Sequence, residues 1–236
     1  MEPPVTEKNF VTVQSTLPSL PYPLVSDRRH IKSGRLLIRE HRASDLEALY
    51  ELRRQPEVMT YTHKGVVDLD RAETQAWLVK KLAPQGNENF DFVIADADTD
   101  VLVGTGGCHL RAGKVGWPEL GYMLRKEAQG KGYATEFVNA FLKAYWALPR
   151  MQTDVAVDVE TVDRHENMGD AKECIVAITQ ARNKASHSVL RKTGWKLVKA
   201  FEEPDRFPKN DGDMVTLYVW TLTKSSKAAT DCARKV

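Results

Sequence analysis

The segment from residue 117 to residue 148 constrains the fold of this chain more than any other part of the sequence. Its first eight residues, 117–124, alternate between two faces with the two-residue period of a strand. Its last part has the three- and four-residue apolar spacing of a helix, carried by Ala134, Phe137, Val138, Phe141, Tyr145 and Leu148. The turn Gln129-Gly130-Lys131-Gly132 joins them. Unpaired N–H groups at a helix start after such a turn can bind a phosphate group.

The rest of the sequence predicts further strands and helices in a mixed order. Apolar runs and two-residue alternation predict strands at residues 35–39, 90–94, 101–103, 174–179, 195–201 and 214–222. Capping signals and helical spacing predict helices at residues 44–54 and 70–82, and a short helix that begins at Asn183. This order predicts an α/β (α+β) fold.

The length of 236 residues favours one domain with tails. Residues 1–30 are rich in proline and predict an extended or flexible N-terminal arm. The domain itself is expected over residues 31–223, with an insertion at about residues 150–172, where an acidic polar run interrupts the regular pattern. Residues 224–236 predict a flexible C-terminal tail.

Composition argues against several classes of protein. The 34 Lys and Arg nearly balance the 32 Asp and Glu, and no basic block carries aromatic residues, so no nucleic-acid partner is expected. No uncharged apolar run reaches the roughly 18 residues of a membrane span. The three cysteines form no paired framework, which favours a cytoplasmic location. The histidines lack the spacing of metal ligands, and no metal is expected.

The motif Gln129-x-x-Gly132-x-Ala134 resembles the acetyl-CoA signature, Q/R-x-x-G-x-G/A, of the GNAT (GCN5-related) N-acetyltransferases. Arg35-Leu36-Leu37-Ile38-Arg39 is similar to the opening strand of the RimJ/RimL-like branch of that family. Three further motifs match this branch in the same order along the chain: Glu119-Leu120-Gly121-Tyr122, Asn183-x-x-Ser186 and Lys192-Thr193-Gly194-Trp195. The resemblance spans about residues 35–222.

This resemblance implies a central mixed, mostly antiparallel, twisted sheet of about six to seven strands flanked by helices. In such a fold two strands, ending here near Leu124 and Gln180, splay apart and admit the pantetheine arm of acetyl-CoA. The backbones of Met123 and Leu124 would then align the thioester, and Asn183, Ser186 and Lys192 would contact the cofactor. The pyrophosphate would be bound by Gln129, Gly130, Lys131, Gly132, Tyr133, Ala134 and Thr135.

Glu119 is the main candidate for the base that removes a proton from an amine acceptor. It lies on the strand whose end would hold the thioester, and branch members often have Glu there. The alternative is a glutamate paired to a Lys or Arg on a solvated strand. His109 could replace or assist Glu119, because imidazole titrates near neutral pH, or it could be an ordinary hydrogen-bonded strand residue.

The acid that would protonate the departing thiolate is harder to assign. Many family members carry a tyrosine seven residues after the position of Asn183, and here that position is Leu190. Ser186 is the substitute that the resemblance suggests, although a serine in a first helical turn also bonds backbone N–H groups. Asn183 has a second interpretation as the N-cap of its helix.

The sequence therefore predicts an acyltransferase that moves an acetyl group from acetyl-CoA to a primary amine by direct attack in a ternary complex. The acceptor would be a peptide N-terminus or a small molecule, and the protein a monomer or homodimer. Two alternatives stay open: a non-catalytic CoA-binding sensor or scaffold with the same fold, and an interaction protein that uses the arm and the insertion.

Overall fold

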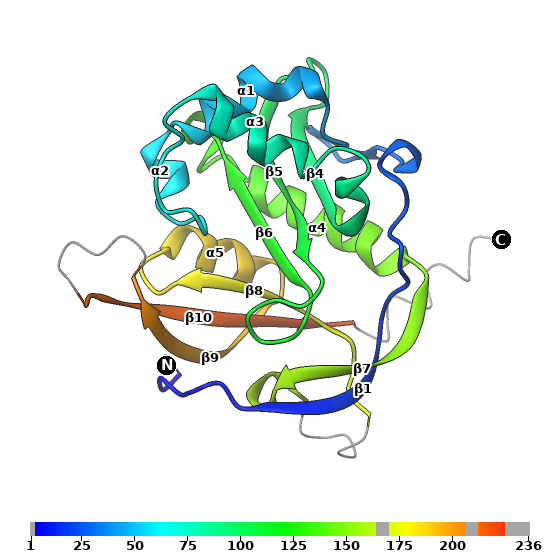
Figure 1. Ribbon diagram of the computed structural model, residues 1–236, viewed down its shortest axis with the longest axis vertical. Coiled ribbons are helices and arrows are strands. Elements are labelled where there is room, and N and C mark those ends of the chain that lie inside the picture. The colour runs from blue at the N-terminus through cyan, green and yellow to red at the C-terminus, as the bar shows by residue number, and fades with distance from the viewer. Residues whose placement is uncertain (1–2, 164–169, 206–211, 225–236) are drawn as a thin grey trace.

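The computed structural model describes residues 3–163, 170–205 and 212–224, which form ten strands and five α-helices (Figure 1). The strands are β1 (Phe10–Pro18), β2 (Ile31–Lys32), β3 (Leu36–Arg39), β4 (Phe90–Asp96), β5 (Leu102–Leu110), β6 (Glu119–Leu124), β7 (Arg150–Asp158), β8 (Cys174–Gln180), β9 (Lys196–Pro204) and β10 (Met214–Thr223). The helices are α1 (Leu46–Arg53), α2 (Pro56–Met59), α3 (Arg71–Val79), α4 (Tyr133–Ala147) and α5 (Lys184–Lys192). None of the helices in these described segments is long and apolar enough to cross a membrane.

Eight of these strands form the central sheet, in the order β2-β3-β4-β5-β6-β8-β10-β9. All neighbours are antiparallel except β6 and β8, which are parallel. The predicted mixed, mostly antiparallel sheet is confirmed. It has one or two strands more than expected, since the two-residue β2 is too short to leave a period in the sequence.

The strands β6 and β8 meet at one end and then separate. Their only paired position in the described chain is Glu119 opposite Val176, at the start of β6. Figure 1 shows the two strands diverging from there toward the starts of α4 and α5. The sheet is therefore open between the end of β6 and the end of β8.

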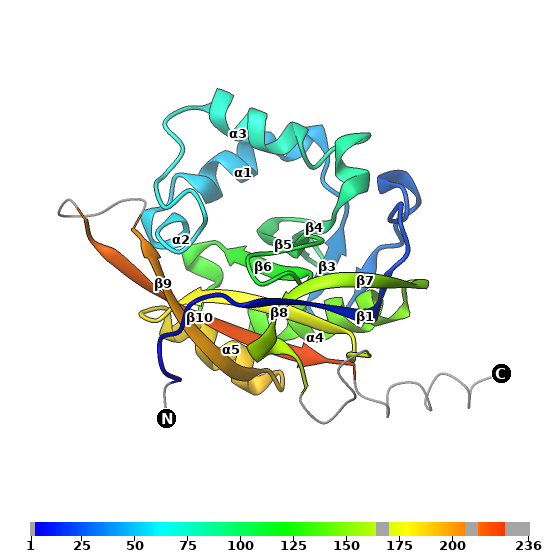
Figure 2. The ribbon, with the colours of Figure 1, turned by 60° about the horizontal axis from the view of Figure 1, so that its bottom comes forward.

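Two layers of helices cover the sheet (Figure 2). Helices α4 and α5 cover one face, where Phe137 and Phe141 of α4 are fully buried in the largest apolar cluster. Helices α1 and α3 cover the β3–β5 part of the other face, where Leu49, Leu52 and Leu78 are fully buried. The two-residue period predicted for β6 is confirmed, because Leu120 and Leu124 pack on the α4 face.

A separate two-stranded ribbon, β1 with β7, covers the rest of that second face. The two strands pair antiparallel along their full lengths, from Phe10 opposite Asp158 to Pro18 opposite Arg150. The sequence predicts the arm and the insertion without relating one to the other, whereas in the structure β1 of the arm pairs with β7 of the insertion. Residues 164–169 of the predicted insertion and 225–236 of the predicted tail lie outside the described residues, and the domain boundaries stay a prediction.

A buried ion pair fixes the ribbon to the central sheet. The Lys199 Nζ of β9 lies 2.9 Å from the Asp158 Oδ2 at the end of β7, and both side chains are fully buried. The same ammonium donates to the Glu7 carbonyl oxygen at 2.6 Å and to the Glu160 carboxylate at 3.0 Å. One lysine thus joins the arm, the end of β7 and the central sheet.

Candidate active site

The turn between β6 and α4 has the geometry of an anion-binding loop. Gly130 and Gly132 have φ angles of +74° and +83°, a region that L side chains rarely adopt. Gly132 is the N-cap of α4 and has no side chain to cap the first turn, so the N–H groups there lack intrahelical partners. A Cβ at Gly130 would meet no atom within 4 Å, which shows that the loop is open on that side. These features fit a phosphate group.

The side chain of Gln129 closes the loop on β6. Its Nε2 donates to the Leu124 carbonyl oxygen at 3.1 Å, and its backbone N–H donates to the Lys126 carbonyl oxygen at 3.1 Å. The side chain of Lys131 is exposed at the rim. In this arrangement Gln129 shapes the loop, while the backbone N–H groups and Lys131 are the groups available to an anion. The contacts predicted for residues 129–135 stay a prediction.

Backbone hydrogen bonds show which groups of β6 face the opening beside β8. The Arg125 N–H donates to a β5 carbonyl oxygen at 2.9 Å, and the Pro118 carbonyl oxygen accepts from a β8 N–H at 2.8 Å. Because backbone groups alternate between the two edges of a strand, those of Met123 face β5, and those of Tyr122 and Leu124 face the opening. The alternation thus favours Leu124, and Tyr122 in place of Met123, as backbone partners of an inserted ligand.

Tyr122 is a side chain that sequence reasoning did not assign to the site. Its hydroxyl is buried and lies beside the Ser186 hydroxyl. Burial raises the pKa of Tyr122 to about 12, and the nearby Ser186 hydroxyl on α5 opposes this increase. Tyr122 and Ser186 thus approach each other from β6 and α5.

Asn183 caps α5, as one of its two interpretations predicts. Its side-chain oxygen accepts a hydrogen bond from the Ser186 N–H at 3.1 Å. The cap fixes the first turn of α5 and thereby the position of Ser186. A contact between Asn183 and a cofactor stays a prediction.

Replacing Asn183 by alanine is expected to lower the free energy of unfolding by about 0.5–2 kcal/mol, because the Ser186 N–H loses its acceptor. Asn183→Ser keeps a capping oxygen and should recover most of this loss. Urea denaturation of both variants measures the difference. Equal stability of Asn183→Ala and the parent chain would contradict a capping role.

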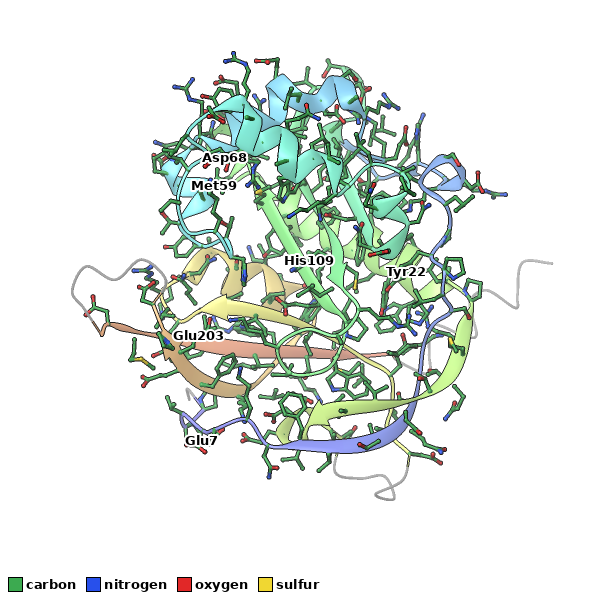
Figure 3. All side chains as sticks on the ribbon, in the orientation of Figure 1. Glu7, Tyr22, Met59, Asp68, His109 and Glu203 are labelled. Carbon is green, nitrogen blue, oxygen red and sulfur yellow. The ribbon has the colours of Figure 1, made fainter. Side chains whose placement is uncertain are left out.

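His109 is the extra residue of a β-bulge in β5. The residues on either side of it pair with the consecutive residues Leu120 and Glu119 of β6, so His109 has no partner in the ladder. The bulge turns the imidazole over Gly121, where a Cβ would lie 2.9 Å from the His109 Cε1. The His109 Nε2 consequently lies 3.9 Å from the Glu119 Oε1. In Figure 3, His109 lies between the α1–α3 layer and the β1–β7 ribbon.

The two candidate bases are therefore neighbours, and Glu119 is well placed for proton transfer. Its side chain is only 13% exposed, and burial raises its pKa above the usual value, while His109 and Lys114 oppose this effect. The Lys114 N–H is 3.5 Å from the Glu119 Oε2, whereas the Lys114 ammonium pairs with Glu203. The burial of Glu119 and the pairing of the Lys114 ammonium with Glu203 disfavour the interpretation of Glu119 as a residue paired to a lysine on a solvated strand, and its role as a base stays a prediction. A carboxylate with a raised pKa is suited to general base chemistry.

Two other residues on α5 bear on the predicted site. Leu190 is fully buried in the apolar cluster beneath α4, so no acid acts from that position. Lys192 is the exposed last residue of α5, at the opposite end of the helix from Asn183, and its contact with a cofactor stays a prediction. Within the described segments, no group of three or more His, Cys, Asp or Glu side chains is arranged to hold a metal ion.

Comparison of sequences relates the chain to acetyltransferases. The model of the Acetyltransferase (GNAT) domain family matches residues 35–196. YnaD of Bacillus subtilis (strain 168), an uncharacterized N-acetyltransferase, is 32% identical over 114 residues. This match covers 48% of the chain and 64% of YnaD, which is less than two thirds of that relative.

Comparison of structures finds the same fold at low sequence identity. A GNAT-family acetyltransferase from Bacillus anthracis is 22% identical, with a TM-score of 0.59 over 83% of this chain and 98% of that one. RimL, a ribosomal L7/L12 alpha-N-protein acetyltransferase solved with coenzyme A, is 15% identical, with a TM-score of 0.56 over 83% and 98%. Since the family model covers well over half of its length, the chain belongs to the GNAT acetyltransferase family.

Proposed function

We propose that this protein is an acetyl-CoA-dependent N-acetyltransferase that acts on a primary amine. The observation that carries the proposal is the opening between β6 and β8, which leads from Glu119 to the loop at Gly130 and Gly132. An elongated thioester with a pyrophosphate at one end fits an opening with an anion-binding loop at one end and a buried carboxylate at the other. The RimL structure that shares this fold holds coenzyme A.

In the proposed reaction, Glu119 accepts the proton of the attacking amine, directly or through a water molecule. The amine nitrogen bonds to the thioester carbonyl carbon, the carbon–sulfur bond breaks, and CoA leaves as a thiolate. The Leu124 N–H would stabilise the oxyanion, and such a donor is worth about 2.7–4 kcal/mol in acyl transfer. The direction of this N–H toward the opening supports the assignment. Ser186, beside Tyr122, is the proposed donor of a hydrogen bond to the sulfur, and no covalent enzyme intermediate forms.

The acceptor is proposed to be a peptide N-terminus, as the name of RimL, an alpha-N-protein acetyltransferase, suggests, or a small amine. The acceptor amine would approach Glu119 from the face of the sheet that carries α1 and α3, because His109 and Glu119 lie on that face. A panel of N-terminal peptides and small primary amines, with free CoA as the readout, tests this assignment.

Acetyl-CoA is expected to raise the melting temperature, since a ligand at 100 times its Kd stabilises the folded state by about 2.7 kcal/mol.

Gly132→Ala should weaken the binding of CoA roughly tenfold or more, because a side chain at positive φ costs about 1–2 kcal/mol and moves the loop. Gly65→Ala is the matched control, because Gly65 has a φ of +75° and precedes α3, outside residues 129–135. Calorimetric titration measures the Kd of CoA for both variants. Equal binding by Gly132→Ala and the parent chain would rule out this loop as the phosphate site.

A non-catalytic CoA-binding protein is the second candidate, and the buried Leu190 favours it because the tyrosine acid is missing. The two candidates differ in one measurement. A sensor would bind CoA and release none from acetyl-CoA with any amine of the panel, whereas the proposed enzyme would release free thiol.

A further inference from the structure

Arg35, the residue immediately before β3, contacts both the loop that precedes α4 and the first turn of α4. Its Nη1 donates to the Lys131 carbonyl oxygen at 3.0 Å, and its guanidinium lies 4.5 Å from the centre of the Tyr133 ring. Its Nε and its backbone N–H donate to the two carboxylate oxygens of Glu136 at 2.9 and 2.7 Å. One arginine thus contacts three residues of the loop and the first turn of α4, although its side chain is 51% exposed.

The carboxylate of Glu136 would oppose the binding of phosphate by this loop. It lies in the first turn of α4, where the phosphate would approach the free N–H groups. Burial raises its pKa, but hydrogen bonds from the Arg35 N–H and the Ser33 hydroxyl, with the Arg35 charge, outweigh that effect and lower it. Glu136 is therefore ionised at neutral pH, and without a partner its charge would repel the phosphates.

We propose that Arg35 is a positioning residue of the CoA-binding loop, which acts by neutralising Glu136 and by holding its carboxylate away from the phosphates. The bidentate fork of an arginine suits this role, because one guanidinium binds the carboxylate and the Lys131 carbonyl oxygen together. The inference rests on the proposed function, since it assumes that the loop binds the pyrophosphate of CoA. It assigns the effect of Arg35 to Glu136 and not to a direct contact with CoA.

A double-mutant cycle at Arg35 and Glu136, with the Kd of CoA measured by calorimetric titration, tests the proposal. Arg35→Gln is expected to raise the Kd roughly tenfold, because the Glu136 carboxylate then keeps only its neutral donors, the backbone N–H of residue 35 and the Ser33 hydroxyl, and its negative charge is no longer balanced near the phosphates. Glu136→Gln should leave the Kd within about twofold of the parent, and the double variant should return to within about threefold. Arg35→Lys keeps the charge and should weaken binding by about threefold at most.

Arg71→Gln is the matched control, because Arg71 also pairs with a carboxylate, Glu47, at 2.7 Å on an exposed surface, but away from the loop. It should leave the Kd unchanged, and the melting temperature of each variant without ligand reports whether it folds. Two results would overturn the inference: an unchanged Kd for Arg35→Gln, or a double variant that binds as weakly as Arg35→Gln. Failure of the parent chain to bind CoA would instead overturn the proposed function.

Discussion

Replacing Glu119 by glutamine is expected to lower kcat by about 10²–10⁴-fold, the usual contribution of a general base. The amide keeps the size of the side chain and cannot accept the proton, so binding of CoA should be retained. Release of free CoA at saturating acetyl-CoA and amine measures the loss. Glu202→Gln, another strand glutamate, which is exposed on β9, is the control and should keep the parent rate.

The pH dependence of the rate is a second test of the role of Glu119. Burial raises the pKa of Glu119, and a base acts only when it is deprotonated. The rate of the parent enzyme should therefore fall as the pH decreases through this raised pKa, above the range of an ordinary carboxyl group. In Glu119→Gln the residual rate should lose this dependence. Full activity in Glu119→Gln together with a large loss in His109→Gln would transfer the role of base to His109.

Replacing Lys199 by methionine is expected to lower the free energy of unfolding by about 3–5 kcal/mol, because Asp158 would stay buried without its cation. Both side chains are fully buried, so water cannot compensate. Lys199→Met combined with Asp158→Asn removes both charges and should recover a large part of the loss. Urea denaturation measures these differences.

Arg71→Met serves as the control for this comparison, because the Arg71–Glu47 pair is exposed and should contribute little. If Lys199→Met unfolds at the same urea concentration as the parent chain, the ion pair does not anchor the ribbon. If the double variant is as unstable as Lys199→Met, the lysine acts through its contacts to Glu7 and Glu160 instead.

The sequence predicts the centre of the molecule well because the signals there are local. The predicted strand at residues 117–124 contains β6, which begins at Glu119, and it is followed by the loop with Gly130 and Gly132 and by α4. The strand and the helix are each recognised by the period of their apolar residues. The cap at Asn183 is equally local, since a side chain bonds an N–H three residues later. The position of the loop proposed to bind the cofactor is therefore visible in the sequence.

Contacts between distant segments leave no such signal. Phe10 of β1 pairs with Asp158 of β7, but neither segment contains a pattern that indicates which strand it pairs with. The pairing of the arm with the insertion could therefore not be predicted from the sequence. The bulge that turns His109 toward Glu119 depends on the register of two strands, and Gly121 alone does not reveal it. The same holds for Arg35, whose side chain reaches a helix that begins about a hundred residues later.

The ribbon of β1 and β7 also has an evolutionary consequence. Each strand satisfies the backbone groups of the other, and Gly116, just before Glu119, packs so closely on β7 that a Cβ there would lie 2.0 Å from the Ala156 carbonyl oxygen. Loss of either strand alone would leave an open edge and loosen the segment that leads to Glu119. The arm and the insertion are therefore expected to be inherited as a unit, gained or lost together among descendants of a common ancestor.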